Sequence, residues 1–526
     1  MATALGEGAA ERARASVAEA EVAALASRAA AWWNAYWTGI PVVELPDRDL
    51  QEAWEYGVFK QAGLTPPCEV AATLQGPWME EYQLPPWSND YHFNINVQMI
   101  YWPALGTGRW DHFEPLWRMI RGWIPTLRAN AAHFFGVDDA LMLPHAVDDR
   151  CYAVGAFWTG MIDHACTAWM AQMAWLHYRH SLDEAVLREV AWPLLTGAFA
   201  GYWAMLEEFE GRLSLPVSVS PEFKGARMDA WGRDASFQLA ACHAVARILP
   251  EAAAVLGQPI DPRWARVAAE LPPYATVRAS RQKDFPERQV QRIALWEGMD
   301  LLESHRHHSH LGSIFPFCTV DPADPDHHAI VSESLYHWVR TGPGAWSGWC
   351  VPWAAILCAR AGWVDGAVTW LKWWKEVFTN EGRGTLHDAD FGGATTLFQL
   401  GSSDGATHDR SAEIMQMDAG MGVVTAVLEL LVQQRPDGLH VVPAVPDRWR
   451  ELRFDGVYVE GAFRIGATVA DRRTVEVRVE SLKGGRIRLH HGLGTTWSAD
   501  GVRGEGDWFE REFAAGERLE LRALRD

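Results

Sequence analysis

Apolar residues recur at three- and four-residue spacing through most of the first 435 residues, which is the pattern of helices that bury one face. Gly or Pro follows several of these segments and marks their ends. No strand pattern alternates with them, so a parallel sheet is not expected. The segments with helical spacing are 12–37, 47–62, 110–135, 161–180, 182–209, 231–248, 262–271, 327–341, 353–362, 365–378 and 422–434.

The pattern changes after Arg435-Pro436-Asp437-Gly438. Short runs rich in β-branched and aromatic residues follow, and turn residues such as Lys483-Gly484-Gly485 separate them. Such runs predict strands. They cover 439–442, 457–463, 474–479, 486–489 and 519–521. The sequence therefore predicts a mainly helical domain over 1–435 and a small β-sandwich-like domain over 436–526.

One stretch, 87–103, combines amides with aromatic residues. Its polar residues His92, Asn94, Asn96 and Gln98 alternate with apolar ones. As an extended segment, it has neutral hydrogen-bonding groups on one face and apolar groups on the other. Because buried amides need partners, this face suits either a hydroxyl-rich ligand or the solvated side of an edge strand.

Composition narrows the possible partners. A net charge of -20 argues against binding to a nucleic-acid backbone or to an anionic membrane surface. The 29 Trp include many that must be structural, but a Trp face also suits stacking on a sugar ring. Seven scattered Cys without a CxxC predict reduced thiols and no zinc site. Neither a signal-peptide pattern nor a membrane-spanning run is visible, so a cytoplasmic protein is expected.

Four further stretches concentrate reactive groups, and each has a structural alternative. Ser220-Pro221-Glu222 is also the pattern of a helix start. The histidines of 305–310 suggest metal, but ligand carboxylates or thiols at set spacings are missing, so we expect hydrogen bonding to a polar ligand or a solvated loop. The loop 342–349 suits a turn whose Trp residues fill the core. Asp418 in 416–422 is also placed to cap the helix that follows.

Two isolated acids on different loops, together with amides and Trp, suit glycoside hydrolysis. One carboxylic acid protonates the leaving oxygen, and a second carboxylate activates water or attacks carbon. The sequence gives no separation between the two acids, so it leaves open whether the reaction inverts or retains the anomeric configuration.

The chain resembles the catalytic part of glycoside hydrolase family 95, the inverting α-L-fucosidases. The matching segments occur in the family's order and lie at 74–76, 86–103, 220–222, 305–311, 346–349 and 416–422. The resemblance implies an (α/α)6 barrel with a small C-terminal β domain. It also implies exo-acting hydrolysis of a terminal α-L-sugar from an oligosaccharide or glycoconjugate, without a metal or organic cofactor.

Site residues follow from the same resemblance. Glu222 matches the family's general acid. Asp418 matches the carboxylate that activates water together with two asparagines, which match Asn94 and Asn96. Residues expected to bind the sugar are His92, Arg306, His307, Trp346 and, from a less distinctive segment, Trp169.

Several positions depart from the family. Phe223 stands where an Asn is common, His308 replaces an aliphatic residue, and Ala419-Gly420-Met421-Gly422 replaces Gly-Asn-Phe-Gly. The family's large N-terminal β domain has no counterpart in this sequence. These departures leave open an α-L-galactosidase, another glycosidase of the same fold, or a catalytically silent carbohydrate-binding protein. A terpene cyclase is a weaker alternative, because Asp138-Asp139 and Asp148-Asp149 do not continue as a metal-binding cluster. The oligomeric state is not predicted.

Overall fold

A computed structural model describes residues 6–19, 21–67, 70–77, 86–154, 158–282, 285–388 and 415–524. The chain divides into two compact units, Met1–Pro41 and Val42–Asp526. The first unit holds α1 (Ala9–Ala18) and α2 (Val22–Thr38). The sequence predicted one helix over 12–37. That prediction is wrong at the junction, because Glu21 adopts an extended conformation and begins a second helix.

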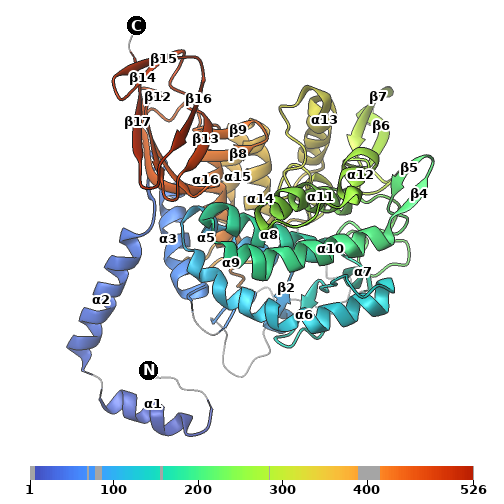
Figure 1. The fold of residues 1–526 in the computed structure, drawn as a ribbon, viewed down its shortest axis with the longest axis horizontal. Coiled ribbons are helices and arrows are strands. Elements are labelled where there is room, and N and C mark those ends of the chain that lie inside the picture. The colour runs from blue at the N-terminus through green and yellow to red at the C-terminus, as the bar shows by residue number, and fades with distance from the viewer. Residues whose placement is uncertain are drawn as a thin grey trace. The chain divides into compact units, whose positions relative to one another are not determined.

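The second unit is mainly helical, and helices occupy the larger part of every segment predicted to be helical (Figure 1). Asp47 caps α3 by accepting hydrogen bonds from the backbone N–H groups of Asp49 and Leu50. The helices are α3 (Arg48–Leu64), α4 (Asn96–Tyr101), α5 (Pro103–Gly106), α6 (Glu114–Phe135), α7 (Trp158–Met161), α8 (Ala165–Ser181), α9 (Glu184–Val186), α10 (Trp192–Met205), α11 (Ser236–Leu256), α12 (Pro262–Glu270), α13 (Pro325–Thr341), α14 (Cys350–Arg360), α15 (Val364–Val377) and α16 (Asp418–Leu431), with short turns η1 (Pro86–Asn89), η2 (Trp110–Phe113), η3 (Leu187–Ala191) and η4 (Ser309–Leu311).

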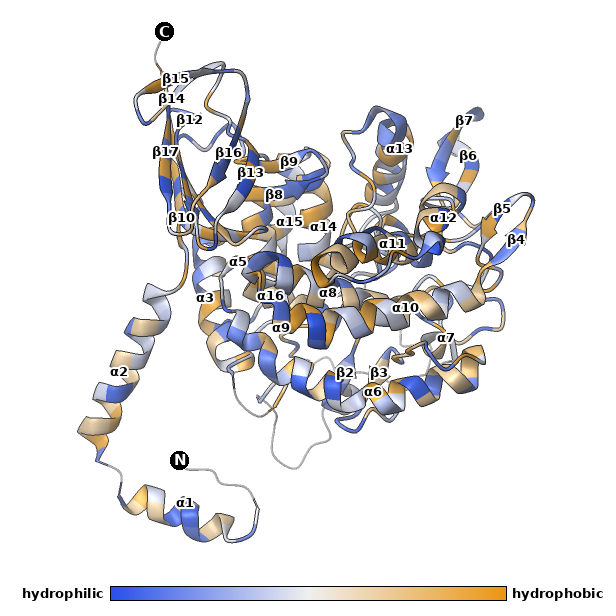
Figure 2. Ribbon diagram, in the orientation of Figure 1, coloured by the Kyte–Doolittle hydropathy of each residue, from blue (hydrophilic) through white to orange (hydrophobic). Residues whose placement is uncertain are grey.

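The longer of these helices fall into two kinds, which alternate along the chain except at α12 and α13. Helices α4, α8, α11, α14 and α16 are buried around most of their circumference. Helices α3, α6, α10, α12, α13 and α15 each leave part of their surface unburied. Figure 2 shows hydrophilic and hydrophobic residues alternating around α6. The first kind therefore forms an inner layer and the second an outer one.

Helix α11 is long and apolar enough to cross a membrane by length and composition alone. However, 61% of its most apolar window is buried inside the protein. It is therefore accounted for as a core helix of the inner layer.

The C-terminal region is built from two β-sheets. A seven-stranded sheet has the order β1-β10-β11-β12-β17-β14-β15, and a four-stranded sheet has the order β16-β13-β9-β8. Phe463 and Trp497 of the first sheet contact Phe513 and Phe509 of the second, with ring centroids 5.7 Å apart in both pairs. The strands are β1 (Val42–Glu44), β8 (Val432–Arg435), β9 (Gly438–Val441), β10 (Leu452–Val459), β11 (Phe463–Ala470), β12 (Arg473–Ser481), β13 (Gly485–His490), β14 (Thr496–Ala499), β15 (Val502–Glu505), β16 (Trp508–Phe513) and β17 (Arg518–Ala523).

This region differs from the predicted strands in several places, and β14, β15, β16 and nearly all of β11 were not predicted. Strand β1 comes from the other end of the chain and pairs antiparallel with β10, Val43 facing Phe454. Residues 432–434, predicted as the end of a helix, lie in β8, and the predicted strand 457–463 spans the end of β10 and the turn before β11. The predicted boundary at 435/436 itself stays a prediction.

Three two-stranded sheets were not predicted: β2 (Tyr91–His92) with β3 (Ala146–Val147), β4 (Glu207–Phe209) with β5 (Arg212–Ser214), and β6 (Thr276–Gln282) with β7 (Phe285–Ile293). The first of them corrects the extended segment predicted for the polar run. The chain leaves β2 at His92, turns over 93–95 and enters α4 at Asn96. The alternation of residues 92–98 therefore does not reflect a continuous strand.

Candidate active site

Glu222 lies on a loop that other buried residues hold in place. Residues 221–226 form turns, so the alternative of a helix start at Ser220 is wrong. The Ser220 and Ser309 hydroxyl oxygens are 2.6 Å apart, and the Ser309 hydroxyl donates to the Pro221 carbonyl at 3.1 Å. These contacts tie the loop to η4. The Glu222 side chain is 9% exposed.

Three groups surround the Glu222 carboxylate. Asn94 Nδ2 donates to Oε1 at 2.9 Å, and an Arg306 guanidinium N–H donates to Oε2. His307 Nε2 lies 3.4 Å from Oε2. Burial by itself would raise the pKa of Glu222, but the charge of Arg306 and the contact with His307 outweigh burial and hold the pKa well below its usual range. Glu222 is thus ionised at neutral pH in the free protein.

Asp418 is the first residue of α16, and its side chain is fully buried. Its Oδ2 accepts a hydrogen bond from Asn96 Nδ2, and its Oδ1 accepts one from the Ala419 N–H at 2.6 Å. Both bonds favour the carboxylate, but burial is the larger effect and raises the pKa of Asp418 to about 6. Asp418 does lie at the start of a helix, as the helix-cap alternative requires. However, it also accepts a hydrogen bond from Asn96, which is distant in the sequence.

Asn94 and Asn96 each contact a different carboxyl group. Asn94 lies in the turn after β2, and Asn96 opens α4. Both are buried, yet Asn94 Oδ1 has no hydrogen-bond partner among the described residues. A buried amide oxygen without a partner is suited to accept a hydrogen bond from a water or from a sugar hydroxyl.

The ring of His92 is held in place by Asp90. Its Nδ1 is hydrogen bonded to the Asp90 carboxylate, which fixes the orientation of the ring. His145, which the sequence did not suggest, lies next to it with ring centroids 5.6 Å apart. Burial lowers the pKa of His145 to about 4, so its imidazole is neutral.

The histidines of 305–310 point to different places. His305 stacks on Phe223 with ring centroids 4.0 Å apart. His308 is buried, accepts a hydrogen bond from Trp338 Nε1 at 3.1 Å, and packs against the core. Within the described residues, no group of three or more His, Cys, Asp or Glu side chains is placed to hold a metal ion.

Two of the predicted sugar-binding residues lie in the core. Trp169 is 1% exposed, and Trp102, Phe237, Phe317 and Trp353 contact its ring. Trp346, also 1% exposed, stacks on Trp338 with ring centroids 5.3 Å apart. Because other side chains cover the faces of both rings, the structure does not support a role for either residue in stacking on a sugar. The alternative of a turn whose Trp residues fill the core accounts for Trp346.

Trp349 is better placed, although the sequence did not single it out. Its ring lies edge-on to His307 with centroids 4.8 Å apart, and it directly precedes α14. Nothing in the sequence separates Trp349 from Trp346, because both end the same loop. Only their positions relative to α14 decide which ring reaches the site.

The site gathers the N-terminal ends of the inner helices. Asn96 and Asp418 open α4 and α16, Trp349 precedes α14, and η4 lies beside the Glu222 loop. The positive ends of these helices favour negative charge at the site.

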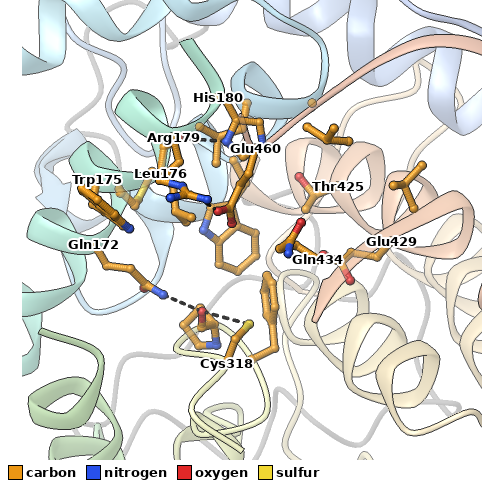
Figure 3. A pocket seen from close by; sticks show the side chains of 18 of the residues that line it. Gln172, Trp175, Leu176, Arg179, His180, Cys318, Thr425, Glu429, Gln434 and Glu460 are labelled. Carbon is orange, nitrogen blue, oxygen red and sulfur yellow. Dashed lines mark hydrogen bonds and ion pairs between the residues drawn. The ribbon is translucent and has the colours of Figure 1, made fainter. Parts of the chain in front are cut away.

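A separate cavity of about 520 Å³ lies elsewhere, lined by the C-terminal halves of α8, α11 and α16 and by β10 (Figure 3). The carboxyl pair does not line it.

Comparison with known proteins identifies the family. Alpha-L-fucosidase 2 of Arabidopsis thaliana is 27% identical over 444 residues, which are 80% of this chain and 48% of that protein. Probable alpha-fucosidase A of Aspergillus niger is 33% identical over 176 residues, 32% of this chain and 22% of that protein. The chain thus spans about half the length, or less, of these relatives.

A putative kojibiose phosphorylase from human microbiome shares the fold, with a TM-score of 0.56 at 10% identity over 96% of this chain and 72% of that one. Residues 44–431 match the glycosyl hydrolase family 95 catalytic domain. The predicted family is therefore confirmed, and the chain belongs to glycosyl hydrolase family 95.

Proposed function

We propose that the protein is an inverting, exo-acting glycoside hydrolase that removes a terminal α-L-fucose or a close relative from a glycan. One observation carries this proposal. Two buried carboxyl groups, Glu222 and Asp418, lie 196 positions apart in sequence, and each accepts a hydrogen bond from one of two asparagines that are two positions apart. The shared segment of the two asparagines supports a single site that contains both carboxyl groups.

The arrangement of helices supports an (α/α)6 barrel as the scaffold. Within the described part of the chain, outer helices α3, α6, α10, α12, α13 and α15 alternate with inner elements α4, α8, α11, η4, α14 and α16. The fourth inner element is only the three-residue turn η4, next to the histidine cluster. A barrel with six inner elements explains why so many N-terminal ends meet at one site.

In the proposed reaction, Glu222 protonates the glycosidic oxygen as the bond to the anomeric carbon breaks. Asp418 takes a proton from a water that attacks the opposite face, so the released sugar has the inverted configuration. Asn96 fixes the Asp418 carboxylate, and the buried oxygen of Asn94 helps to orient that water. The imidazole of His307 and the guanidinium of Arg306 donate to sugar hydroxyls.

The charge states of the free protein require a change when substrate binds. A general acid must be protonated, but Arg306 keeps Glu222 ionised, whereas Asp418 is the more easily protonated group. Sugar hydroxyls that accept the Arg306 hydrogen bonds would draw this cation from Glu222, and the bound sugar would displace water from the carboxylate. Both effects raise the pKa of Glu222. The reverse assignment, with Asp418 as acid, is the alternative that the pKa shifts favour.

The first test is hydrolysis of α-linked L-fucosides, L-galactosides and common D-glycosides, with the released anomer followed by NMR. We expect one L-configured substrate to release its inverted sugar. Release of the retained anomer contradicts the mechanism. Sugar binding without release from any substrate favours the carbohydrate-binding alternative.

A second test separates the roles of the two carboxyl groups. Glu222→Gln should lose nearly all activity on a natural glycoside but keep much of it on an aryl glycoside with a weakly basic leaving group, which needs no protonation. Asp418→Asn should be inactive on both, since the water is not activated. The opposite pattern would assign the acid to Asp418.

A further inference from the structure

Behind the Glu222 loop lies a buried hydrogen-bond network that the proposed reaction does not use. Its centre is Gln238 of α11, which is 2% exposed. Gln238 Oε1 accepts from the Ala165 N–H and from the Tyr202 hydroxyl, both at 3.0 Å. Its Nε2 donates to Asp163 Oδ1 at 2.6 Å and to the Val219 carbonyl at 3.3 Å. The Gln238 side chain thus links α8, α10 and α11 to the loop segment that leads to Glu222.

We propose that Asp163 and Gln238 are positioning residues for Glu222, and that Asp163 is a third ionisable carboxyl group electrostatically coupled to it. The inference rests on the proposed function in that Glu222 is taken as a reacting group. Val219 is three residues before Glu222, so a shift at Val219 displaces the carboxylate. Ser218 reinforces the same point, because its hydroxyl accepts from the Ala235 N–H at 2.7 Å, one residue before α11.

The surroundings of Asp163 give it an unusual charge state. Asp163 is 2% exposed, and its Oδ2 has no hydrogen-bond partner among the described residues. Burial raises the pKa of Asp163 to about 7, the hydrogen bonds from Gln238 and Cys166 oppose this, and the charge of Glu222 raises it further. The titratable groups that face Asp163 are Cys166 of α8, Tyr202 of α10 and Glu222. The thiol and phenol are neutral near pH 7, so Glu222 is the charged neighbour.

Coupling between two carboxyl groups is reciprocal. If the charge of Glu222 raises the pKa of Asp163, then removal of that charge lowers it. Likewise, at pH values above about 7, where Asp163 is ionised, its charge opposes the ionisation of Glu222. The neutral Asn of Asp163→Asn keeps an acceptor for Gln238 but cannot ionise. Below about pH 6 this variant therefore resembles the wild-type state of Asp163.

The decisive experiment measures the coupling without turnover. Infrared spectroscopy of the full-length protein between pH 5 and 9 should show a buried protonated carboxyl band that Asp163→Asn removes. In Glu222→Gln the same band should titrate at lower pH. Buried Asp418, whose pKa is raised to about 6, gives a second band at the acidic end of this range. An unchanged titration in Glu222→Gln, or a spectrum of Asp163→Asn that loses no band, overturns the coupling. Since no substrate is used, this result is independent of whether the protein is a hydrolase.

The positioning role is tested on an active substrate with a matched control. Gln238→Leu should lower kcat about 10- to 100-fold with KM changed by less than about threefold, as expected when a reacting group is misplaced by a fraction of an ångström. Gln172→Leu is the control, because Gln172 is equally buried on α8 but donates to the Pro316 carbonyl instead. Equal kcat losses in both variants would reduce Gln238 to a packing residue.

Asp163→Asn completes the test, and it does not depend on Gln238→Leu being folded. Its kcat should stay within about twofold of wild type below pH 6, and the alkaline limb of its pH profile should move to lower pH, because the charge that favours protonated Glu222 is gone. Asp163→Ala, which also removes the acceptor for Gln238, should lose activity at every pH. A pH profile of Asp163→Asn that matches wild type would contradict the proposal.

Discussion

Glu222 and Asp418 are both buried carboxyl groups, yet their surroundings shift their pKa values in opposite directions. A cation and an imidazole beside Glu222 outweigh burial, whereas the amide beside Asp418 does not. Neutral hydrogen bonds therefore leave a buried acid able to take up a proton near neutral pH, and a guanidinium prevents it. Arg306 is the residue that decides which carboxyl group is protonated first.

Arg306→Met tests this directly. Without the cation, the pKa of Glu222 rises, so protonated Glu222 persists to higher pH. If Glu222 is the acid, the alkaline limb of kcat/KM moves to higher pH, although kcat/KM falls because a sugar contact is also lost. Arg227→Met is the control, since Arg227 is 71% exposed and pairs with Asp229. A shift of the acid limb instead would identify Glu222 as the base.

Asp418→Asn should stabilise the protein at neutral and alkaline pH. The raised pKa means that folded Asp418 binds its proton more tightly than the unfolded chain does, so wild-type stability falls as pH rises from about 4 to about 6. The variant avoids this loss, by on the order of 1–3 kcal/mol above pH 6. Denaturant unfolding at pH 5 and pH 8 measures it, with Asp149→Asn as control at a 79% exposed position. A gain that is the same at both pH values would contradict the explanation.

At this scale, the family resemblance singled out Glu222, Asp418, Asn94 and Asn96, whereas residue patterns alone left structural alternatives open for each of them. In the structure each carboxyl group contacts one of the two asparagines. The roles assigned to them stay predictions. Asp163 and His145 were missed, because a single Asp or His in a long helical sequence carries no pattern, and burial is a property of the fold.

At the scale of elements, the approach of α3 to α16 fixes the position of Asp418. A Cβ on Gly57 of α3 would lie 2.3 Å from Val424 Cγ2 and 3.1 Å from the Gly420 carbonyl, two residues after Asp418. Val424 is fully buried, so its methyl group cannot move away freely. Only a glycine permits the two helices to pack at this distance.

Gly57→Ala should therefore destabilise the protein by about 1–3 kcal/mol and lower kcat, because α16 must shift. Gly122→Ala on α6 is the matched control. A Cβ there meets nothing within 4 Å, so the substitution should stabilise the helix by about 0.5–1 kcal/mol. Thermal unfolding and kcat of both variants give the comparison. A stabilised Gly57→Ala with normal kcat would show that the helices adapt at little cost.

Elements with a regular period were predictable, and local exceptions were not. The helices predicted over 110–135 and 365–378 agree with α6 and α15 because their apolar stripe repeats at helical spacing. The polar run 92–98 was misread, since a period of two over four pairs also fits a strand end, a turn and a helix start. The hairpin β6–β7 was missed because its strands are rich in charged and polar residues, which hide a strand pattern.

At the scale of the whole second unit, the helices present opposite ends to two different environments. The N-terminal ends of α4 and α16 carry Asn96 and Asp418, whereas Glu222 lies on a loop. The C-terminal halves of α8, α11 and α16 line the cavity bounded by β10 (Figure 3). Arg179 of α8 links this helix to the β-sheet through an ion pair with Glu460, which directly follows β10. The N and O atoms of the pair are 2.9 Å apart. The pairing of β1 with β10 brings a further segment into the same sheet, and short-range patterns cannot predict such a long-range pairing.

A substitution in that cavity should change stability without changing catalysis. The Thr425 hydroxyl of α16 lines the cavity and has no hydrogen-bond partner among the described residues. Thr425→Val replaces it with a methyl group of the same shape and should stabilise the protein by about 1 kcal/mol, with kcat and KM unchanged.

Thr107→Val is the matched opposite, because the fully buried Thr107 hydroxyl donates to the Pro103 carbonyl at 2.7 Å, and its loss should cost about 1 kcal/mol. Denaturant unfolding of both variants decides the matter. Equal losses in the two would mean that water satisfies Thr425 as fully as the backbone satisfies Thr107, and altered kinetics in Thr425→Val would mean that the two ends of the helices are coupled.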